Sequence, residues 1–479
     1  MSVEPIGLVI LLLGILILKR GPLFGIYAFI PSTLMGACAA LILSGTTIQP
    51  AHLLMGFMAM AVLSRPGTWS HISSRLTFPR EGFWFIATAS IGVVGAYLFP
   101  RIFAGSTYVA AVGSAASGAF MVQVPLGPTS GNFTQSIYFI GDLICFLTCY
   151  IVARTREGFE AATKAFLLYC GMNILFALLD IATFQTNTGF LLDFMRNSTY
   201  AMMDDDIVNG MKRIVGSFTE ASSFSYATTG ASAFAFRLWL GGVRPTLTLS
   251  LALINMTLLI LSTSTTAYVA LPVLLAYMYA TTLWRAMRAS ALPRSVFAFL
   301  AFAPLLLVVG VAIVLLTPSW SATVYQMIND MIFNKATSDS GVERGSCNRS
   351  AINTFFVTYG LGAGIGTLRA SSFPLAVISN LGAAGTITYG LFILMTLFKR
   401  APQALDWDVH EVRAAARTAC IALMIPASLS GALIDLGLPF SILAALACAA
   451  NEVEPVERPE ETFEIIPHAI HPGLSQLSS

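Results

Sequence analysis

Charged side chains are scarce in this chain of 479 residues. Asp, Glu, Lys and Arg together make up 10% of it, whereas a soluble globular domain carries about 25%. Hydrophobic residues account for 56% of the chain, and long apolar segments recur from one end to the other. This composition excludes an ordinary soluble enzyme and predicts a polytopic membrane protein.

The alternation of apolar and polar residues that marks a transmembrane β-barrel is also missing. The expected fold class is therefore all-α, a polytopic helical membrane protein with about 12–14 transmembrane helices. The stretch 103–125 is rich in Gly, Ala and Ser, and we expect either one more span or a re-entrant loop there. The predicted spans lie near residues 5–18, 22–43, 51–64, 83–99, 134–152, 165–184, 216–236, 246–262, 265–284, 296–317, 373–398, 416–434 and 436–450.

Metal-binding and redox motifs are absent from the sequence. The seven cysteines are scattered, without a Cys-x-x-Cys pair or the Cys/His spacing of a zinc site. Most lie in apolar runs and are expected to be small core residues. No histidine stands beside the arginine-containing loops, so neither a metal nor another cofactor is expected. The net charge of +2 comes from short loops between helices and does not indicate binding to nucleic acid.

The distribution of Lys and Arg predicts how the chain is oriented. If the spans alternate across the membrane, 18 of the 26 Lys and Arg residues fall on one side, which is then the cytoplasmic side. The opposite side carries two sizeable polar loops, at about 185–215 and 318–372. The first apolar run lacks an Ala-x-Ala cleavage pattern and is expected to be a span. The acidic, proline-containing segment 451–479 is expected to be a disordered cytoplasmic tail.

The second polar loop holds the strongest functional signal. Arg344 and Arg349 lie there, followed by a glycine-rich turn, and we expect a mobile backbone around them. Arginine matches phosphate oxygens bidentately, and fixed positive charge stabilises a departing diphosphate. Glycines let the backbone approach a ligand and present amide groups to it. The alternative is a solvated loop whose arginines contact lipid headgroups. The glycines of this turn are Gly362, Gly364 and Gly366. The segment 351–356, between Arg349 and the turn, is expected to be a short amphipathic element.

A second constellation begins in the first polar loop and enters the next predicted span. If residues 213–220 are helical, Arg213 lies at the mouth of the span and Glu220 about two turns inside it. A carboxylate within a span normally faces a cavity or a partner. Glu220 is then either a buried base, a partner that orients an arginine, or half of a structural ion pair. The acidic run 204–206 either binds a cation or forms a solvated turn that pairs with Lys212 or Arg213.

A third feature is the hydroxyl-rich break Leu261–Ala267 between two predicted spans. It either lines a polar cavity or its hydroxyl groups bond to helical carbonyls.

In this order, the three features resemble the bacterial O-antigen polymerase and ligase superfamily, the Wzy- and WaaL-like proteins. The resemblance covers roughly residues 165–400. Arg349 and Gly360 also fit the Arg-x10-Gly spacing of some polymerases. The matching positions are Arg213, Gly216, Phe218 and Glu220; Leu261 to Ala267; and Ser340, Gly341, Arg344, Gly362, Gly364, Gly366, Gly382 and Gly385.

The resemblance implies an architecture like that of the GT-C glycosyltransferases in the bacterial inner membrane, with the active face in the periplasm. Residues 165–400 would form the catalytic core, between N-terminal helices in 1–164 and C-terminal helices in 401–450. Members join lipid-linked glycans, which implies metal-independent, inverting glycosyl transfer from a glycan on undecaprenyl diphosphate. The implied partners are that donor, membrane lipids, a chain-length co-polymerase and a flippase.

The resemblance also implies roles for particular residues. Arg344, with Arg349 and Arg369, would hold the diphosphate, and Arg213 would contact the substrate. Gly362, Gly364 and Gly366 would bind it through their backbone. Two residues are candidates for deprotonating the acceptor hydroxyl, Glu220 and Glu343.

Some positions depart from the family pattern. Ligases have a histidine where Ser371-Ser372-Phe373 stands here, and this absence favours a polymerase. Ala221-Ser222 replaces the usual Pro-Asn, and Tyr359 replaces a proline. The expected function is therefore polymerisation of exopolysaccharide, capsule or O-antigen repeat units.

Two alternatives are a ligase of the same superfamily and a transporter or flippase for a lipid-linked glycan or an anionic solute. A flippase should carry charges along a path through many spans. Here the predicted spans hold few, chiefly Glu220 with Asp142, Asp180 and Asp435.

Overall fold

The computed structural model describes residues 2–43, 46–112, 121–199, 202–203, 206–208, 211–289, 292–318, 321–322, 325–326, 329, 339–400 and 405–453. The chain is mostly helical, and seven helices are long and apolar enough to cross a membrane. These findings confirm a membrane-embedded helical protein. The seven are α5 (Glu81–Ile102), α6 (Ser130–Ala153), α7 (Arg156–Gln185), α10 (Thr265–Ala286), α11 (Arg294–Leu316), α14 (Phe373–Phe398) and α15 (Trp407–Ser430).

Shorter helices occupy the other predicted spans. The segment predicted as one span over 22–43 is helical only as far as Ser32, and the chain then continues into a strand. The shorter helices are α1 (Pro5–Arg20), α2 (Pro22–Ser32), α3 (Pro50–Leu63), α8 (Ala221–Leu240), α9 (Pro245–Leu261) and α16 (Gly437–Ala449), with α4 (Thr68–Arg75) outside the predicted spans.

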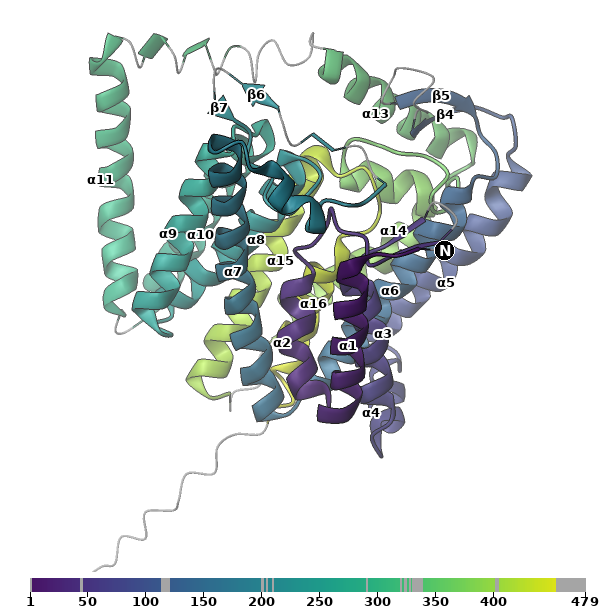
Figure 1. Ribbon diagram of the computed structural model, residues 1–479, viewed down its shortest axis with the longest axis horizontal. Helices are drawn as coiled ribbons and strands as arrows, with labels where there is room; N and C mark the ends of the chain where they lie inside the picture. Colours follow the sequence, from purple (N-terminus) through teal and green to yellow (C-terminus); the bar gives the residue numbers. More distant parts are fainter. Residues whose placement is uncertain are drawn as a thin grey trace, which may run out of the picture.

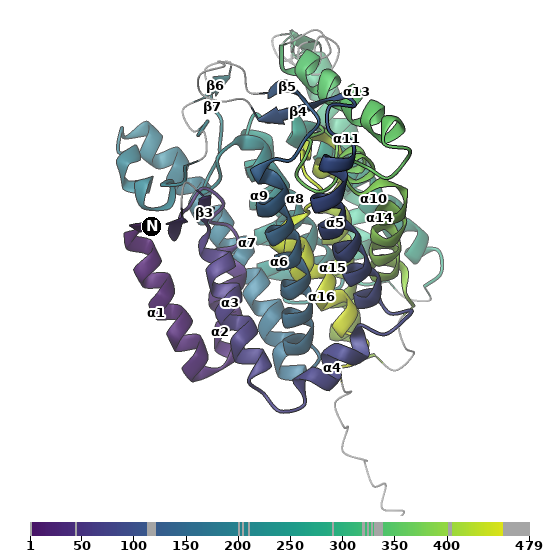
Figure 2. The same ribbon diagram turned by 90° about the vertical axis from the view of Figure 1, so that its right-hand side faces the viewer.

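Tight connections make sequential helices run in opposite directions. Gly21 alone separates α1 from α2, and two residues separate α6 from α7. Such short links hold neighbours antiparallel, and Figures 1 and 2 show the long helices side by side. Around them, α8 packs between α9 and α15, α5 packs against α14, and α6 packs against α16.

The aromatic core joins α5, α6 and α14. The Phe85 ring stacks on Phe392 with centroids 4.3 Å apart, and the Tyr389 ring meets the edge of Phe139 at 5.5 Å. Offset and edge-to-face pairs of this kind add to the burial of the rings.

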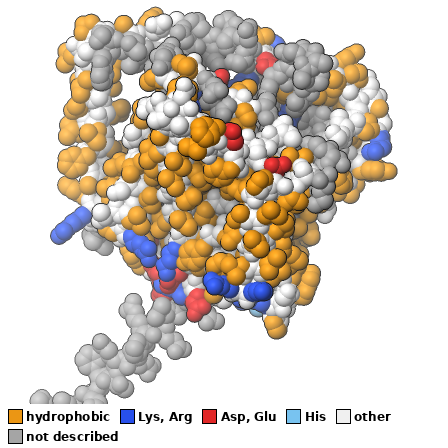
Figure 3. All heavy atoms as spheres, viewed as in Figure 1, with side chains coloured by type: hydrophobic (Ala, Val, Ile, Leu, Met, Phe, Trp, Pro, Cys, Tyr) orange, Lys and Arg blue, Asp and Glu red, His pale blue; other side chains and the backbone are white. Residues whose placement is uncertain are grey.

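One end of the bundle, which we call the basic end, is where α6 ends and α7 begins. Lys and Arg side chains gather there, below a broad apolar band (Figure 3). All five tryptophans that the structure describes lie in α4 or within the terminal turns of helices at this end: Trp69, Trp84, Trp239, Trp284 and Trp407. Tryptophan is enriched at membrane–water interfaces, so the basic end has the character of an interface.

Buried ion pairs hold the basic end together. Arg75 of α4 is almost fully buried, and its Nη1 lies 2.9 Å from Glu81 Oε2. The other oxygen of Glu81 lies 2.8 Å from Lys399 Nζ. Arg75 also pairs with Glu452. Glu452 was expected in a disordered tail, so that prediction is wrong for residues 451–453. Residues 454–479 lie outside the described part of the chain.

The opposite end, which we call the loop end, carries small β elements that the all-α expectation did not include (Figure 2). Residues 103–125 contain a hairpin of β4 (Tyr108–Val112) and β5 (Met121–Pro125), with Tyr108 opposite Pro125. Within the described residues this segment does not form the additional helical span that was one of the two expectations. The other strands are β1 (Ser2–Val3), β2 (Leu41–Leu43) and β3 (Thr46–Ile48) in one sheet, and β6 (Ile207–Val208) and β7 (Met211–Lys212) in another.

Candidate functional site

Both polar loops predicted to share one face lie at the loop end. The first contributes the 3-10 helix η2 (Gly189–Met195) and the β6–β7 pair, and the second contributes α13 (Asp339–Val357). Both ribbon views show β6–β7 and α13 apart (Figures 1 and 2). Among the described residues, no hydrogen bond or ion pair joins Arg213 or Glu220 to α13. The two groups of predicted site residues therefore share an end but do not touch.

The arginine-containing stretch, which was expected to be part of a polar loop, forms the helix α13. Cys347, Ala351 and Thr354 form a buried stripe along α13, and their spacing is that of one helical face. This stripe packs α13 against β4 and α14. Residues 351–356, predicted as a short amphipathic element, are the second half of this helix.

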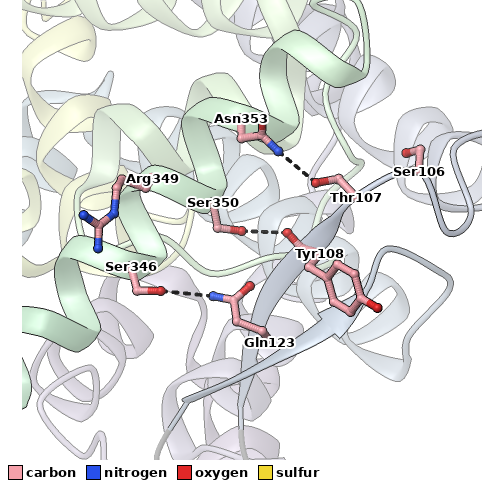
Figure 4. Close-up of a pocket in the computed structure, with 8 residues that line it drawn as sticks. All are labelled: Ser106, Thr107, Tyr108, Gln123, Ser346, Arg349, Ser350 and Asn353. Carbon is pink, nitrogen blue, oxygen red and sulfur yellow. Dashed lines mark hydrogen bonds between the residues drawn. The ribbon is translucent and has the colours of Figure 1, made fainter.

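Polar side chains attach α13 to the hairpin, as Figure 4 shows. Ser350 Oγ donates to the Tyr108 carbonyl oxygen at 2.9 Å, and Asn353 Nδ2 donates to Thr107 Oγ1 at 3.0 Å. These bonds fix the face of the helix that carries Arg349.

An open groove of about 520 Å³ follows the seam between α13 and the hairpin. Its volume falls within the range of small-molecule sites, about 300–1,000 Å³. Apart from one arginine the lining is uncharged, and the Tyr108 side chain is 64% exposed. The lining residues are Ser106, Thr107, Tyr108, Gln123, Ser346, Arg349, Ser350 and Asn353.

Two arginines of α13 have no counter-charge within the described part of the chain. Arg349 is exposed and extends away from the hairpin (Figure 4), whereas Arg344 is partly buried. Neither forms an ion pair with a described residue. A guanidinium in this situation keeps its donors for an anion, and phosphate fits them bidentately.

Glu343 and Arg369 lie near these arginines. Burial raises the pKa of the Cys347 thiol, and the charge of Glu343 raises it further. Arg369 follows the glycine-rich turn, and its backbone N–H donates to the Ala110 carbonyl of the hairpin at 2.9 Å. The structure thus places Arg369 beside the hairpin against which α13 packs.

The glycine-rich turn packs closely on the bundle, and the amides of Gly362 and Gly364, which were predicted to bind the substrate, donate hydrogen bonds within the protein. The Gly362 amide donates to Thr358 Oγ1 at 3.1 Å, and the Gly364 amide donates to the Asn380 carbonyl at 2.9 Å. Gly366 has a φ of +76°, and a side chain there would overlap the Gly131 backbone of α6. These glycines let the chain approach α5, α6 and α14 closely.

Asp180 organises the first polar loop, a role that the sequence analysis missed. It is fully buried near the end of α7. Its Oδ1 accepts from Arg196 Nη2 at 2.6 Å and from Lys212 Nζ, and its Oδ2 accepts from the amides of Val215 and Gly216 at 2.8 and 3.0 Å. A signal was present, because a lone aspartate near a span end preceded two cations in the following loop.

Glu220 lies at the N-cap position of α8 rather than two turns inside a helix. The bonds from Asp180 hold residues 215 and 216 in a non-helical conformation, with a φ of +57° at Gly216. The helix consequently starts at Ala221. Glu220 is half-buried and accepts from the hydroxyl groups of Ser222 and Ser223.

Arg213 does not pair with Glu220. Its Nη1 lies 3.3 Å from Asp206 Oδ2 in a partly exposed pair. The expected pairing of the acidic turn with Arg213 is thus confirmed for Asp206, while Asp204 and Asp205 lie outside the described residues.

The hydroxyl-rich break separates α9 from α10, as expected. Ser262 Oγ donates to the Leu259 carbonyl at 2.7 Å, in agreement with the carbonyl-bonding interpretation. The hydroxyl groups of Thr263 and Ser264 are buried and have no hydrogen-bond partner among the described residues. In this break the hydroxyl group of Ser262 is therefore bonded to a helical carbonyl, and those of Thr263 and Ser264 can still bond to a polar ligand or water.

A carboxyl pair lies inside the bundle. Asp142, in the middle of α6, interacts with Asp435, in the turn between α15 and α16. The buried Nδ1 atom of His52 has no partner among the described residues, and the ring packs 4.9 Å from that of Tyr138, one turn before Asp142. The sequence analysis counted these acids as marginal.

No family model matches this chain, and no curated protein sequence matches it. Its class is therefore defined by its own structure. It is a helical, membrane-embedded protein with a polar groove that contains an arginine at one end.

Proposed function

We propose that this protein is a membrane glycan polymerase. It joins oligosaccharide repeat units carried on undecaprenyl diphosphate into exopolysaccharide, capsule or O-antigen. In this proposal about 12–14 helices cross the bacterial inner membrane, the basic end is cytoplasmic, and the loop end is periplasmic. A chain-length co-polymerase and a flippase are expected partners.

The observation that carries the proposal is the setting of Arg344 and Arg349. Both belong to one helix at the loop end, and neither is neutralised by a described carboxylate. Arg349 lines a groove whose remaining lining offers hydroxyl and amide groups and an exposed tyrosine ring, and Arg344 lies on the same helix outside that lining. A diphosphate suits the arginines, and sugar hydroxyl groups suit the groove.

The chemistry is an inverting displacement. An acceptor hydroxyl attacks the anomeric carbon of the donor sugar, the bond to the diphosphate oxygen breaks, and undecaprenyl diphosphate leaves. The arginines stabilise the charge that develops on the leaving group. Glu343 is favoured over Glu220 as the base that accepts the hydroxyl proton, because it shares α13 with the arginines whereas Glu220 lies on the other loop.

Replacement of the two arginines tests the proposal. Arg344→Ala and Arg349→Ala should each abolish polymer, and single repeat units should accumulate on the lipid carrier while the protein stays in the membrane. The measurement is gel analysis of surface polysaccharide together with the lipid-linked pool. Arg101→Ala is a matched control, because Arg101 is an exposed arginine at the same end, stacked on Tyr97 and outside the groove. Normal polysaccharide chain length in both Arg344→Ala and Arg349→Ala would refute the proposal.

The Asp142–Asp435 pair favours a second candidate, a proton-coupled transporter of lipid-linked glycan. Ionisable residues inside a bundle are typical of proton relays. Under this candidate Asp142→Asn would leave repeat units on the cytoplasmic leaflet, whereas under the polymerase proposal Arg344→Ala leaves them on the periplasmic leaflet. Leaflet-specific cleavage of the glycan distinguishes the two outcomes. The missing ligase histidine at 371–373 places a ligase third.

A further inference from the structure

Four helix ends meet around a cavity of about 180 Å³ at the basic end. The C-terminal turns of α8 and α10 and the N-terminal turns of α11 and α15 form its walls. Helix C-termini carry partial negative charge and N-termini partial positive charge. With two ends of each kind, these contributions oppose one another, and the side chains determine the charge of the cavity.

Those side chains leave an excess of positive charge. Glu411 lines the cavity, and its Oε2 lies 2.5 Å from Arg237 Nη1. Its Oε1 lies 3.2 Å both from Arg285 Nη2 and from His410 Nδ1. One carboxylate thus serves two guanidinium groups, and both of its oxygens are already engaged. A buried cation without full compensation is costly.

Hydrogen-bond donors are also left over. Arg237 is only 6% exposed, and its Nη2 atom is buried without a partner among the described residues. Arg285, which lines the cavity, has half of its side chain exposed and uses one of its nitrogens on Glu411. A guanidinium has five N–H donors, so the site can still bind an anion.

The remaining walls are apolar and face the membrane interface. Leu292 and Val296 line the cavity from the start of α11, and Trp407 lines it from α15. Beyond the cavity α11 stands at the edge of the bundle (Figure 1), and Phe299 is its single buried residue. An apolar chain leaving the cavity can therefore lie along α11 without displacing packed side chains.

We propose that this cavity binds the phosphate of an anionic phospholipid, with the acyl chains lying along α11. The chemistry required is a phosphate group for Arg285 and an apolar chain for the wall beside it. Arg237 does not line the cavity and contributes by sharing the carboxylate of Glu411 with Arg285. Basic pockets between helices near the interface suit such headgroups. The site lies at the end opposite the proposed glycan groove, and it stands whether or not the polymerase proposal holds.

Lipid retention and thermal stability test this site on the purified full-length chain. The protein is incubated in detergent with dimyristoyl phosphatidylglycerol or dimyristoyl phosphatidylcholine, and bound lipid is counted by native mass spectrometry. Phosphatidylglycerol should be retained and should raise the melting temperature, whereas phosphatidylcholine should do neither. Arg285→Gln should weaken phosphatidylglycerol binding about tenfold, the effect of losing one charge-assisted contact.

Arg288→Gln is the matched control. Arg288 lies two residues past the end of α10 and is exposed, but it stacks on Trp284 and does not line the cavity. This variant should bind phosphatidylglycerol as the parent chain does. The melting temperature of Arg285→Gln without lipid shows whether the variant is folded.

Two results would overturn the proposal. Equal loss of lipid in the Arg285 and Arg288 variants would mean general attraction of anionic lipid to the basic end. Inorganic phosphate that reproduces the full stabilisation at matched concentration would mean that the site takes a free anion rather than a lipid.

Discussion

A single carboxylate, Asp180, accepts hydrogen bonds from four donors of the first polar loop. Arg196 and Lys212 are both largely buried beside it. At the scale of residues, the shape of this loop thus depends on the charge of one side chain rather than on local helix or strand propensity.

Asp180→Asn should lower the free energy of unfolding by about 3–5 kcal/mol, because it removes the buried carboxylate that Arg196 and Lys212 share. The measurement is unfolding by sodium dodecyl sulfate in mixed micelles. Asp206→Asn serves as the control, since it breaks only the exposed pair with Arg213 and should change stability by about 0.5 kcal/mol or less. Equal effects of the two substitutions would contradict the organising role of Asp180.

At the scale of elements, the glycine-rich turn seats the loop end on the bundle. Gly362, Gly364 and Gly366 all have positive φ angles and approach the backbone of other segments. The turn positions α13 between the hairpin and α14, and with it the arginines of the proposed site.

Gly366→Ala should destabilise the protein by at least about 1–3 kcal/mol, because it adds strain at a positive φ and an overlap with α6. Gly345→Ala should instead stabilise it by about 0.5–1 kcal/mol, since Gly345 lies within α13 with open space around it. Thermal midpoints of the two variants provide the measurement. A harmless Gly366→Ala would show that the turn does not require its close packing.

The sequence predicted elements whose signal is local and missed those that depend on distant contacts. Runs of apolar residues identified the helices because burial in lipid acts on each segment separately. The start of α8 was predicted too early. A hydrogen bond from the Val215 amide to Asp180, 35 residues away, holds the segment before α8 in a non-helical conformation. The hairpin in 103–125 was missed because its pairing with α13 joins residues 242 positions apart. For the same reason α13 was expected to be part of a polar loop.

The candidate site was predictable in its residue types and less so in its geometry. The sequence singled out Arg344 and Arg349, and both lie at the loop end without an ion-pair partner among the described residues. Glu220 was expected about two turns inside a helix and instead lies at the N-cap of α8. Arg213 pairs with Asp206, in agreement with one of the pairings expected for the acidic turn. The groove was unforeseen, since half of its lining comes from the hairpin.

At the scale of the whole molecule, the two ends differ in charge, and no cysteine is exposed at either end. All seven cysteines are buried, so a new surface cysteine can report on accessibility without interference. Ser106 at the loop end and Ser70 at the basic end are both exposed.

Ser106→Cys should react with a membrane-impermeant maleimide in intact spheroplasts, and Ser70→Cys should react only after permeabilisation, if the basic end is cytoplasmic. The extent of labelling is read from gel mobility after coupling to a polymer-bearing maleimide. The reverse pattern would invert the proposed orientation and remove the basis for a periplasmic active face.

The contact between Arg75 and Glu452 has a consequence for the order of assembly. The two residues are 377 positions apart, and at about 5–20 residues per second the ribosome needs roughly 20–75 s to pass from one to the other. During that interval Arg75 is without one of its carboxylates while the helices from α5 to α16 are synthesised. The basic end therefore closes last, and a nascent chain that stalls before residue 452 exposes an unfinished surface that a protease can recognise.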